Sequence, residues 1–248
     1  MNDHPDLRVA VLGVGQMGAY HTASLTERTK GARVTVINDF SAERAEAVSA
    51  QTPGSRVVAD PFEAVNAEDV DAVLIATPGP AHEDQLRACL ERGLPVLCEK
   101  PLTPEPSTAY DVVKTEAALG RRLIQVGFMR RFDHEYVALR RLIADGGLGD
   151  PLVVHCTHRN AKVVPYFTAE MMINDAVVHE IDTTRYLLGE EITAVRAIKP
   201  TPSSKSPQGL SDPMIVLFET ESGRVVTVEI FVSTGVAYEV RTEVVGED

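Results

Sequence analysis

The stretch that decides the fold is LRVAVL (residues 7–12) followed at once by GVGQMG (residues 13–18). Its first half is apolar apart from one arginine, which is typical of a strand buried on both faces of a parallel sheet. Its second half has the glycine spacing G-x-G-x-x-G, and a helix is expected behind it from Ala19 to Arg28. The order strand, glycine turn, helix is the context in which this spacing indicates a dinucleotide-binding site.

Each glycine of the motif answers a separate steric demand. Gly13 permits a tight turn, Gly15 lets the backbone approach a pyrophosphate, and Gly18 allows the helix to pack closely on the strand. The first N–H groups of the helix would then face the phosphates. The expected phosphate-binding residues are Gly13, Val14, Gly15, Gln16, Met17 and Gly18.

Asp39 lies at the position where dinucleotide-binding domains carry an acid that binds the ribose. The next expected strand, Ala32–Asn38, is followed by Asp39, about twenty residues beyond the glycines, where a carboxylate can accept hydrogen bonds from a ribose diol. The same charge would repel a 2′-phosphate, so Asp39 favours NAD over NADP as the cofactor. A glycine turn with an unrelated acid is the alternative.

Strand and helix patterns continue to alternate up to residue 126. Further apolar runs end at Ala59, Ala76, Cys98 and Val126, and helical segments separate them. Six strands alternating with helices predict an α/β Rossmann domain, a doubly wound parallel sheet, over residues 1–126.

Two proline-containing loops follow the strands that end at Ala76 and Cys98. Ligands of open parallel sheets bind at the carboxyl ends of the strands. We therefore expect the cofactor near Ala76, Thr77, Pro78, His82, Glu99 and Lys100. For Lys100 the alternative is a solvated lysine in a turn, and for His82 it is a surface position.

The pattern changes after residue 126, where an α+β domain with a mainly antiparallel open sheet is expected over residues 127–248. Helices are expected at Phe132–Ala144 and from about Glu170 to Leu188. Strands are expected at Pro151–Thr157, Ile192–Ile198, Met214–Glu219, Arg224–Phe231 and Tyr238–Val245.

The second of these helices carries a group of titratable residues. Asp175 and His179 are four residues apart and Asp182 follows three later, so all three would share one face while Glu180 points elsewhere. A carboxylate beside an imidazole orients it and raises its basicity, as a general base requires. The alternatives are a purely structural hydrogen-bonded set and a metal shell completed by His155 and His158. No second histidine completes a zinc-protease motif, so no metal is expected.

Composition excludes several classes of protein. A formal net charge of −12 argues against nucleic acid and anionic membranes as partners. No apolar run is long enough to span a bilayer, and the first residues lack the order of a signal peptide. Three scattered cysteines fit a reducing cytoplasm.

Six strings together carry a family resemblance: GVGQMG (13–18), INDF (37–40), CEKP (98–101), QVGFMRR (125–131), HCTHRN (155–160) and DAVVHEID (175–182). On these residues the chain resembles the Gfo/Idh/MocA oxidoreductases, which include glucose–fructose oxidoreductase, inositol dehydrogenase and rhizopine-catabolism proteins. QVGFMRR, HRN and VHEID are most similar to the inositol dehydrogenase branch.

The resemblance implies an NAD-dependent dehydrogenase that oxidises a secondary alcohol of a cyclic polyol, with myo-inositol first among the candidates. It implies catalytic roles for Lys100, Asp175 and His179. It also implies polyol contacts, which are Lys100, Arg130, His158, Asn160, Asp175, His179 and Tyr238. A homo-oligomer, a tetramer in the family, is the implied assembly. Family members continue beyond Asp248, so the second domain is expected to be truncated.

Other functions remain open at this point. The substrate could be another inositol isomer or a pyranose sugar. The chain could also be an inactive fragment or a non-catalytic NAD sensor of the same fold, since fold does not determine function. A metal-dependent hydrolase is the last alternative.

Overall fold

A computed structural model describes residues 6–248 of the chain. It divides into two compact units, Met1–Gly127 and Phe128–Asp248. Residues 1–5, part of the segment expected not to be a signal peptide, lie outside the described part. No helix within residues 6–248 is both long and apolar enough to cross a membrane.

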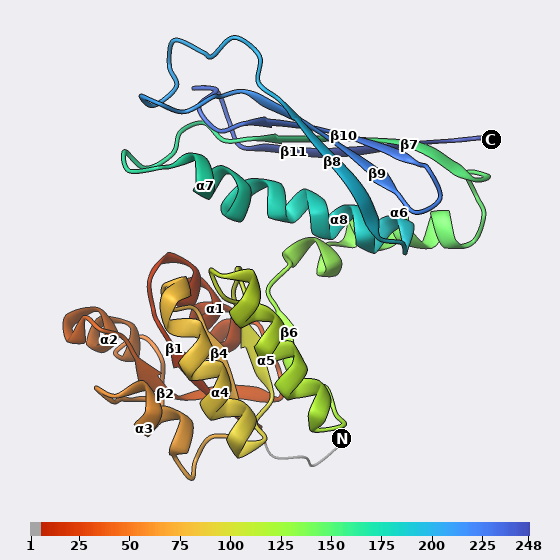
Figure 1. The fold of residues 1–248 in the computed structure, drawn as a ribbon. Coiled ribbons are helices and arrows are strands. Elements are labelled where there is room, and N and C mark those ends of the chain that lie inside the picture. The colour runs from red at the N-terminus through yellow and green to blue at the C-terminus, as the bar shows by residue number, and fades with distance from the viewer. Residues whose placement is uncertain (1–5) are drawn as a thin grey trace. The chain divides into compact units, whose positions relative to one another are not determined.

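The first unit contains a six-stranded parallel sheet (Figure 1). Its strand order is β3-β2-β1-β4-β5-β6, which is the order of a dinucleotide-binding Rossmann fold and confirms the predicted doubly wound sheet. The strands are β1 (Leu7–Leu12), β2 (Ala32–Asn38), β3 (Arg56–Val57), β4 (Ala72–Ile75), β5 (Val96–Cys98) and β6 (Ile124–Val126).

The central strand β1 is buried on both faces, as its apolar run predicts. Ala10 and Leu12 belong to one hydrophobic cluster, while Val9 and Val11 belong to another. The helices are α1 (Gln16–Glu27), α2 (Ala42–Ser49), α3 (Pro61–Asn66), η1 (Gly79–Ala81), α4 (His82–Arg92) and α5 (Pro106–Ala118). Helix α1 begins three residues earlier than predicted, because the glycine turn leads directly into its first turn.

The second unit contains a five-stranded sheet in the order β11-β7-β10-β9-β8. Three of its strand pairs are antiparallel, as predicted, and the pair β10–β7 is parallel. The strands are β7 (Pro151–Arg159), β8 (Ile192–Ile198), β9 (Met214–Thr220), β10 (Val225–Phe231) and β11 (Glu239–Gly246).

Helices of the second unit lie along one face of this sheet, and no helix lies on its other face in Figure 1. They are η2 (Met129–Phe132), α6 (His134–Ala144), α7 (Ala169–Met171), η3 (Met172–Val177) and α8 (Val178–Leu188). The prediction of one regular helix from Glu170 to Leu188 is wrong in detail. Residues Met172–Val177 form a π-helical segment, a feature that often occurs at functional sites.

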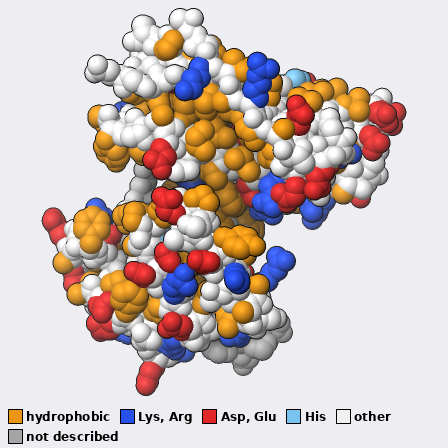
Figure 2. Space-filling model, viewed as in Figure 1, with side chains coloured by type: hydrophobic (Ala, Val, Ile, Leu, Met, Phe, Trp, Pro, Cys, Tyr) orange, Lys and Arg blue, Asp and Glu red, His pale blue; other side chains and the backbone are white. Residues whose placement is uncertain are grey.

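The surface carries both signs of charge. Over the first unit, acidic and basic side chains are interspersed in Figure 2, and no broad basic area is visible on the face that it shows. Hydrophobic side chains gather on parts of the second unit in the same view.

Candidate active site

The glycine turn has the geometry that a pyrophosphate requires. Gly13 has φ of 82°, and a Cβ there would lie 2.6 Å from the carbonyl oxygen of Ala76. A Cβ on Gly18 would overlap the carbonyl oxygen of Gly13. A Cβ on Gly15, in contrast, would meet nothing within 4 Å. The turn is therefore closely packed at Gly13 and Gly18 but open at Gly15, where backbone N–H groups can bind a phosphate.

Asp39 lies beside this turn with its side chain only 2% exposed. Its carboxylate accepts hydrogen bonds from the backbone N–H groups of Val14 and Ser41, each at 2.8 Å. Burial favours the neutral acid, but hydrogen bonds from Arg44 and from the two N–H groups outweigh it and lower the pKa of Asp39. Asp39 is thus a fixed anion next to the phosphate-binding turn.

His82 connects the two loops at the carboxyl ends of β4 and β5. Its Nε2 lies 2.8 Å from the carbonyl oxygen of Thr77, and its Nδ1 lies 2.9 Å from that of Pro101. The residue is 1% exposed, so the alternative of a surface histidine is wrong. Both ring nitrogens face protein carbonyls, so His82 links the loop at Thr77 to the loop at Pro101.

Glu99 and Lys100 follow β5 at the same edge of the sheet. The Glu99 carboxylate lies 2.7 Å from Nε2 of His21 and accepts the backbone N–H of Lys100 at 3.3 Å. Burial alone would raise the pKa of Glu99, but the bond from His21 keeps it below its ordinary value. A Cβ on Gly127 would lie 3.1 Å from this carboxylate, so the glycine leaves room for it. The Lys100–Pro101 peptide bond is cis.

In the second unit, the carboxylate of Glu180 is fully buried, with an exposed fraction of 0%. Its two carboxylate oxygens accept hydrogen bonds from Nη1 and Nη2 of Arg130 at 2.6 and 2.7 Å. Arg130 is 5% exposed and also donates to the hydroxyl of Thr183 at 3.2 Å. Both terminal nitrogens of Arg130 are therefore engaged by Glu180 and Thr183.

His158 adds a ring to this group from the inward face of β7. Its Nδ1 lies 3.1 Å from Oε1 of Glu180. Its ring centroid lies 6.0 Å from that of His179 and 6.0 Å from that of Tyr238. The structure therefore brings together three residues that the resemblance names as polyol contacts.

Asp175 and Asn160, two other predicted site residues of this unit, are close in sequence to His179 and His158. Asp175 belongs to the π-helical segment immediately before α8, where His179 is 5% exposed. Asn160 follows β7, two residues beyond His158, and its backbone bonds to Phe231 and Thr234.

Sequence reasoning missed two members of the group. Phe128 lies edge-on to His179, with 6.3 Å between ring centroids, and Glu180 was expected only to point away from the Asp175–His179 face. The sequence signals for this group were Glu180, directly after His179, and the adjacent pair Arg130 and Arg131. Neither signal reveals which acid is buried.

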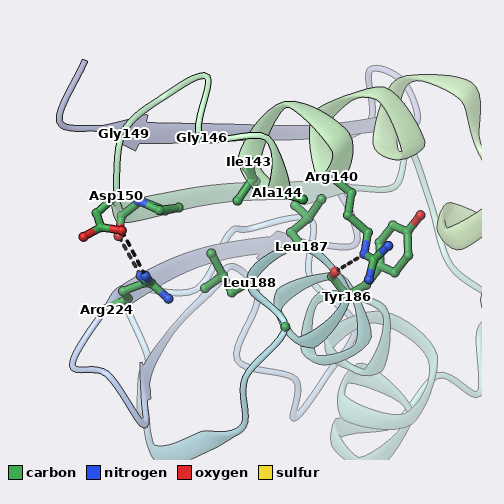
Figure 3. A pocket seen from close by; sticks show the side chains of 12 residues that line it. Arg140, Ile143, Ala144, Gly146, Gly149, Asp150, Tyr186, Leu187, Leu188 and Arg224 are labelled. Atoms are coloured by element: carbon green, nitrogen blue, oxygen red, sulfur yellow. Dashed lines mark hydrogen bonds and ion pairs between the residues drawn. The ribbon is translucent and has the colours of Figure 1, made fainter.

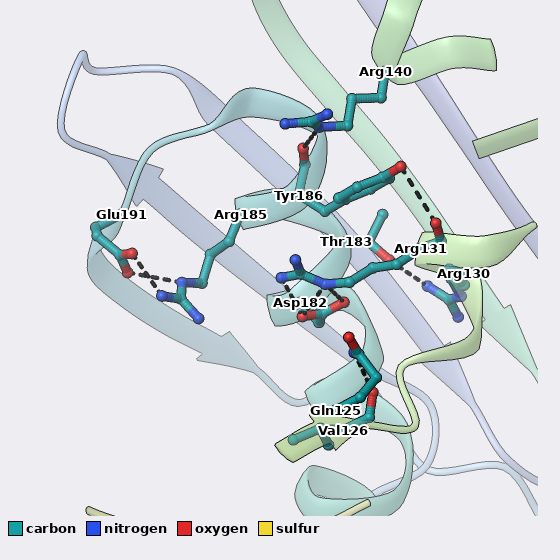
Figure 4. Close-up of polar contacts among 10 residues, drawn as sticks. All are labelled: Gln125, Val126, Arg130, Arg131, Arg140, Asp182, Thr183, Arg185, Tyr186 and Glu191. Atoms are coloured by element: carbon teal, nitrogen blue, oxygen red, sulfur yellow. Dashed lines mark hydrogen bonds and ion pairs between the residues drawn. The ribbon is translucent and has the colours of Figure 1, made fainter. Parts of the chain in front are cut away.

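Asp182 does not join the histidines. Both of its oxygens accept hydrogen bonds from Arg131, at 2.7 to 3.0 Å, and Arg131 lies over the ring of Tyr186 (Figure 4). The alternative of a metal shell finds no support either. His155 points to the opposite face of the sheet from His158, toward Thr227, and no three metal-ligand side chains gather anywhere in residues 6–248.

A hollow of about 570 Å³ lies elsewhere in the second unit (Figure 3). Arg140 and Tyr186 line one side of it, and Asp150 and Arg224 line the other. It reaches the end of α8 at Gly189, ten residues or ~15 Å along the helix from His179. None of the predicted site residues lines it, so it is a separate feature.

Comparison with known proteins agrees with this geometry. Residues 7–128 match the family model described as an oxidoreductase family with an NAD-binding Rossmann fold, and residues 136–248 match the GFO/IDH/MocA C-terminal domain. The chain belongs to the GFO/IDH/MocA oxidoreductase family. This membership confirms the resemblance on which the expected NAD cofactor depends.

Relatives in this family are similar along the entire chain. Inositol 2-dehydrogenase of Rhodococcus erythropolis is 63% identical over 247 residues, which cover 100% of this chain and 71% of the relative. The enzyme of the same name from Streptomyces avermitilis is 53% identical, over 97% of this chain and 70% of its own. The crystal structure of myo-inositol dehydrogenase from Lactobacillus casei with NAD(H) and myo-inositol has a TM-score of 0.94 and 35% identity, over 98% of this chain and 72% of its own.

Proposed function

We propose that this protein is an NAD-dependent dehydrogenase that oxidises myo-inositol to 2-keto-myo-inositol (scyllo-inosose). The observation that carries the proposal is the 63% identity, over 100% of the chain, to a protein named inositol 2-dehydrogenase. The open glycine turn and the buried anion Asp39 fit the dinucleotide. The histidines and tyrosine of the second unit fit a ligand that presents several hydroxyl groups.

Oxidation of a secondary alcohol needs a group that removes the hydroxyl proton, because an alcohol is hardly ionised near neutral pH. In this proposal His179 accepts that proton and Asp175 orients the imidazole. Lys100 donates a hydrogen bond to the reacting oxygen and stabilises the negative charge that develops there. NAD, when bound, supplies the hydride acceptor.

The other side chains fix which carbon reacts. We propose that His158, Asn160 and Tyr238 bind the remaining hydroxyls. Arg130 supports them indirectly through its bonds to Glu180. A ring of similar hydroxyls can bind in several rotated positions, so each fixed partner removes some of the unproductive ones. Selection among inositol isomers or pyranose sugars would follow from the same contacts.

The test is NADH formation with a panel that contains myo-inositol, other inositol isomers and pyranose sugars, each with NAD and with NADP. Lys100→Ala and His179→Ala should each lower kcat/KM by at least about a hundredfold. Lys114→Ala and His134→Ala, at exposed positions on α5 and α6, are the matched controls and should keep full activity. Binding of NAD without oxidation of any sugar or polyol would favour the NAD-sensing alternative.

Two further parts of the proposal concern assembly and location. We propose that a homo-oligomer forms on the face of the second sheet that no helix covers. Val153, Val225 and Val245 are neighbours across three strands on that face. We also propose a reducing cytoplasm, since all three cysteines are buried and unpaired within the described residues.

A further inference from the structure

Glu180 brings a full negative charge into the interior of the second unit. A buried ion pair is weak evidence for stability, because apolar residues of similar volume often serve the fold equally well. Burial would raise the pKa of Glu180, yet the bonds from His158 and Arg130 outweigh it and keep the carboxylate ionised. Because burying the Glu180 carboxylate carries a large desolvation cost, we expect it to have a role besides packing.

The contacts of His158 indicate that role. An ionised carboxylate can only accept hydrogen bonds, so the 3.1 Å contact with Glu180 requires the proton of the imidazole on Nδ1. The competing contact, from Nη2 of Arg130 to the same Nδ1, is longer at 3.4 Å, and Nη2 already donates to Glu180 at 2.7 Å. In neutral His158 the other nitrogen, Nε2, is then an acceptor.

We infer that Glu180 is a positioning residue that fixes the tautomer of His158, so that Nε2 accepts a hydrogen bond from a hydroxyl of the polyol. Arg130 balances the charge of Glu180 and fixes the orientation of its carboxylate through two paired hydrogen bonds. The inference rests on the proposed function for the nature of the ligand. The tautomer itself depends only on contacts inside the second unit.

Glu180→Gln tests this arrangement because it keeps the shape of the side chain while replacing one acceptor by an N–H donor. The amide can then donate to Nδ1 of His158 and move the imidazole proton to Nε2, which would turn the acceptor into a donor. The KM for myo-inositol should rise about tenfold, which corresponds to the loss of one hydrogen bond to a buried group. The value of kcat should change less, and the Kd for NAD should stay the same. Glu180→Asp keeps the charge and should restore part of the lost affinity.

A direct reading of the tautomer comes from the nitrogen resonances of the histidine rings. In the wild-type chain, Nδ1 of His158 should show the shift of a protonated nitrogen and Nε2 that of an unprotonated one, with His158→Gln assigning the signals. In Glu180→Gln the two should exchange. Thr184→Val is the matched control, since Thr184 is fully buried on the same helix and its hydroxyl has no hydrogen-bond partner among the described residues.

Glu180→Gln could unfold the chain by leaving Arg130 buried without its anion. The double variant Arg130→Met, Glu180→Gln removes both charges and should show the same exchange and the same rise in KM. A wild-type His158 protonated on Nε2, or a folded Glu180→Gln variant with unchanged KM, would overturn the inference. The resonances need no turnover, so a chain that oxidises no inositol would contradict the proposed function while they still decide the tautomer.

Discussion

The guanidinium of Arg44 binds both oxygens of the Asp39 carboxylate, with Nη2 at 2.8 Å from Oδ1 and Nε at 3.2 Å from Oδ2. Together with the N–H groups of Val14 and Ser41, each oxygen has two donors, which fills the acceptor capacity of a carboxylate. A ribose diol can therefore bind Asp39 only by displacing a donor. Arg44 is the one able to move, because its side chain is 40% exposed.

This pair predicts how cofactor preference can be changed. Asp39→Ser should remove the charge that repels a 2′-phosphate and leave Arg44 free to bind one. The ratio of kcat/KM for NADP to that for NAD should rise at least about tenfold, from one removed repulsion and one gained ion pair. In the double variant Asp39→Ser, Arg44→Ala most of that gain should disappear. A wild-type preference for NADP would show that Asp39 does not have the role proposed for it.

Two glycines of the phosphate turn should respond in opposite ways to alanine. Gly15→Ala adds a methyl group where nothing lies within 4 Å, so the melting temperature should stay near that of the wild type while NAD binding weakens. Gly18→Ala overlaps the carbonyl oxygen of Gly13 and should lower the free energy of unfolding by ~1–3 kcal/mol or more. Thermal melts and NAD titrations of both variants check the contrast, and equal melting temperatures would contradict it.

His82→Ala should affect the cofactor through the two loops that the ring holds. Loss of the contacts with the carbonyls of Thr77 and Pro101 should cost about 2 kcal/mol of stability and raise the KM for NAD. His134→Ala, whose side chain is 93% exposed, is the control and should change neither value. A His82→Ala variant with a normal melting temperature and a normal KM for NAD would show that His82 does not hold the two loops in place.

Acid should destabilise the first unit in part through Asp71. Hydrogen bonds from Arg8 lower the pKa of this carboxyl from 3.8 to about 2. A group with a lower pKa in the folded chain contributes stability above its unfolded pKa and loses it as the pH falls through the folded value. The contribution of Asp71 should therefore be complete above pH 3.8 and disappear toward pH 2.

Asp71→Asn should reduce the acid loss by less than about 1 kcal/mol, because the side chain is partly exposed. Denaturant unfolding measured at several pH values checks this, with Asp111→Asn, an exposed position on α5, as the control. Identical pH dependence in the wild type and in Asp71→Asn would exclude the contribution.

The first unit follows closely from its sequence because its signals are local. A buried strand, three glycines that no side chain could replace without a clash or a lost opening, and Asp39 after the next strand all fall within about forty residues. The second unit follows less closely because its features depend on partners far away in the chain. The parallel pairing of β10 with β7 joins segments about seventy residues apart, and no turn signal announces it.

The site in the second unit shows the same limit. The spacing of Asp175 and His179 suggested a shared face, but the π-helical segment that carries Asp175 leaves no mark in hydrophobic periodicity. Asp182, three residues beyond His179, was expected on the same face and is bound by Arg131 instead. Glu180 is buried because Arg130, fifty residues earlier, reaches it, and only the folded chain brings those two together.

The most direct test of the central claim uses myo-inositol that carries deuterium on the carbon to be oxidised, incubated with NAD and the wild-type chain. We predict that scyllo-inosose forms, that the deuterium is recovered in the reduced cofactor, and that Lys100→Ala and His179→Ala give neither product at a comparable rate. Formation of the ketone without deuterium in the cofactor, or bound NAD with no oxidation of myo-inositol, would contradict this claim.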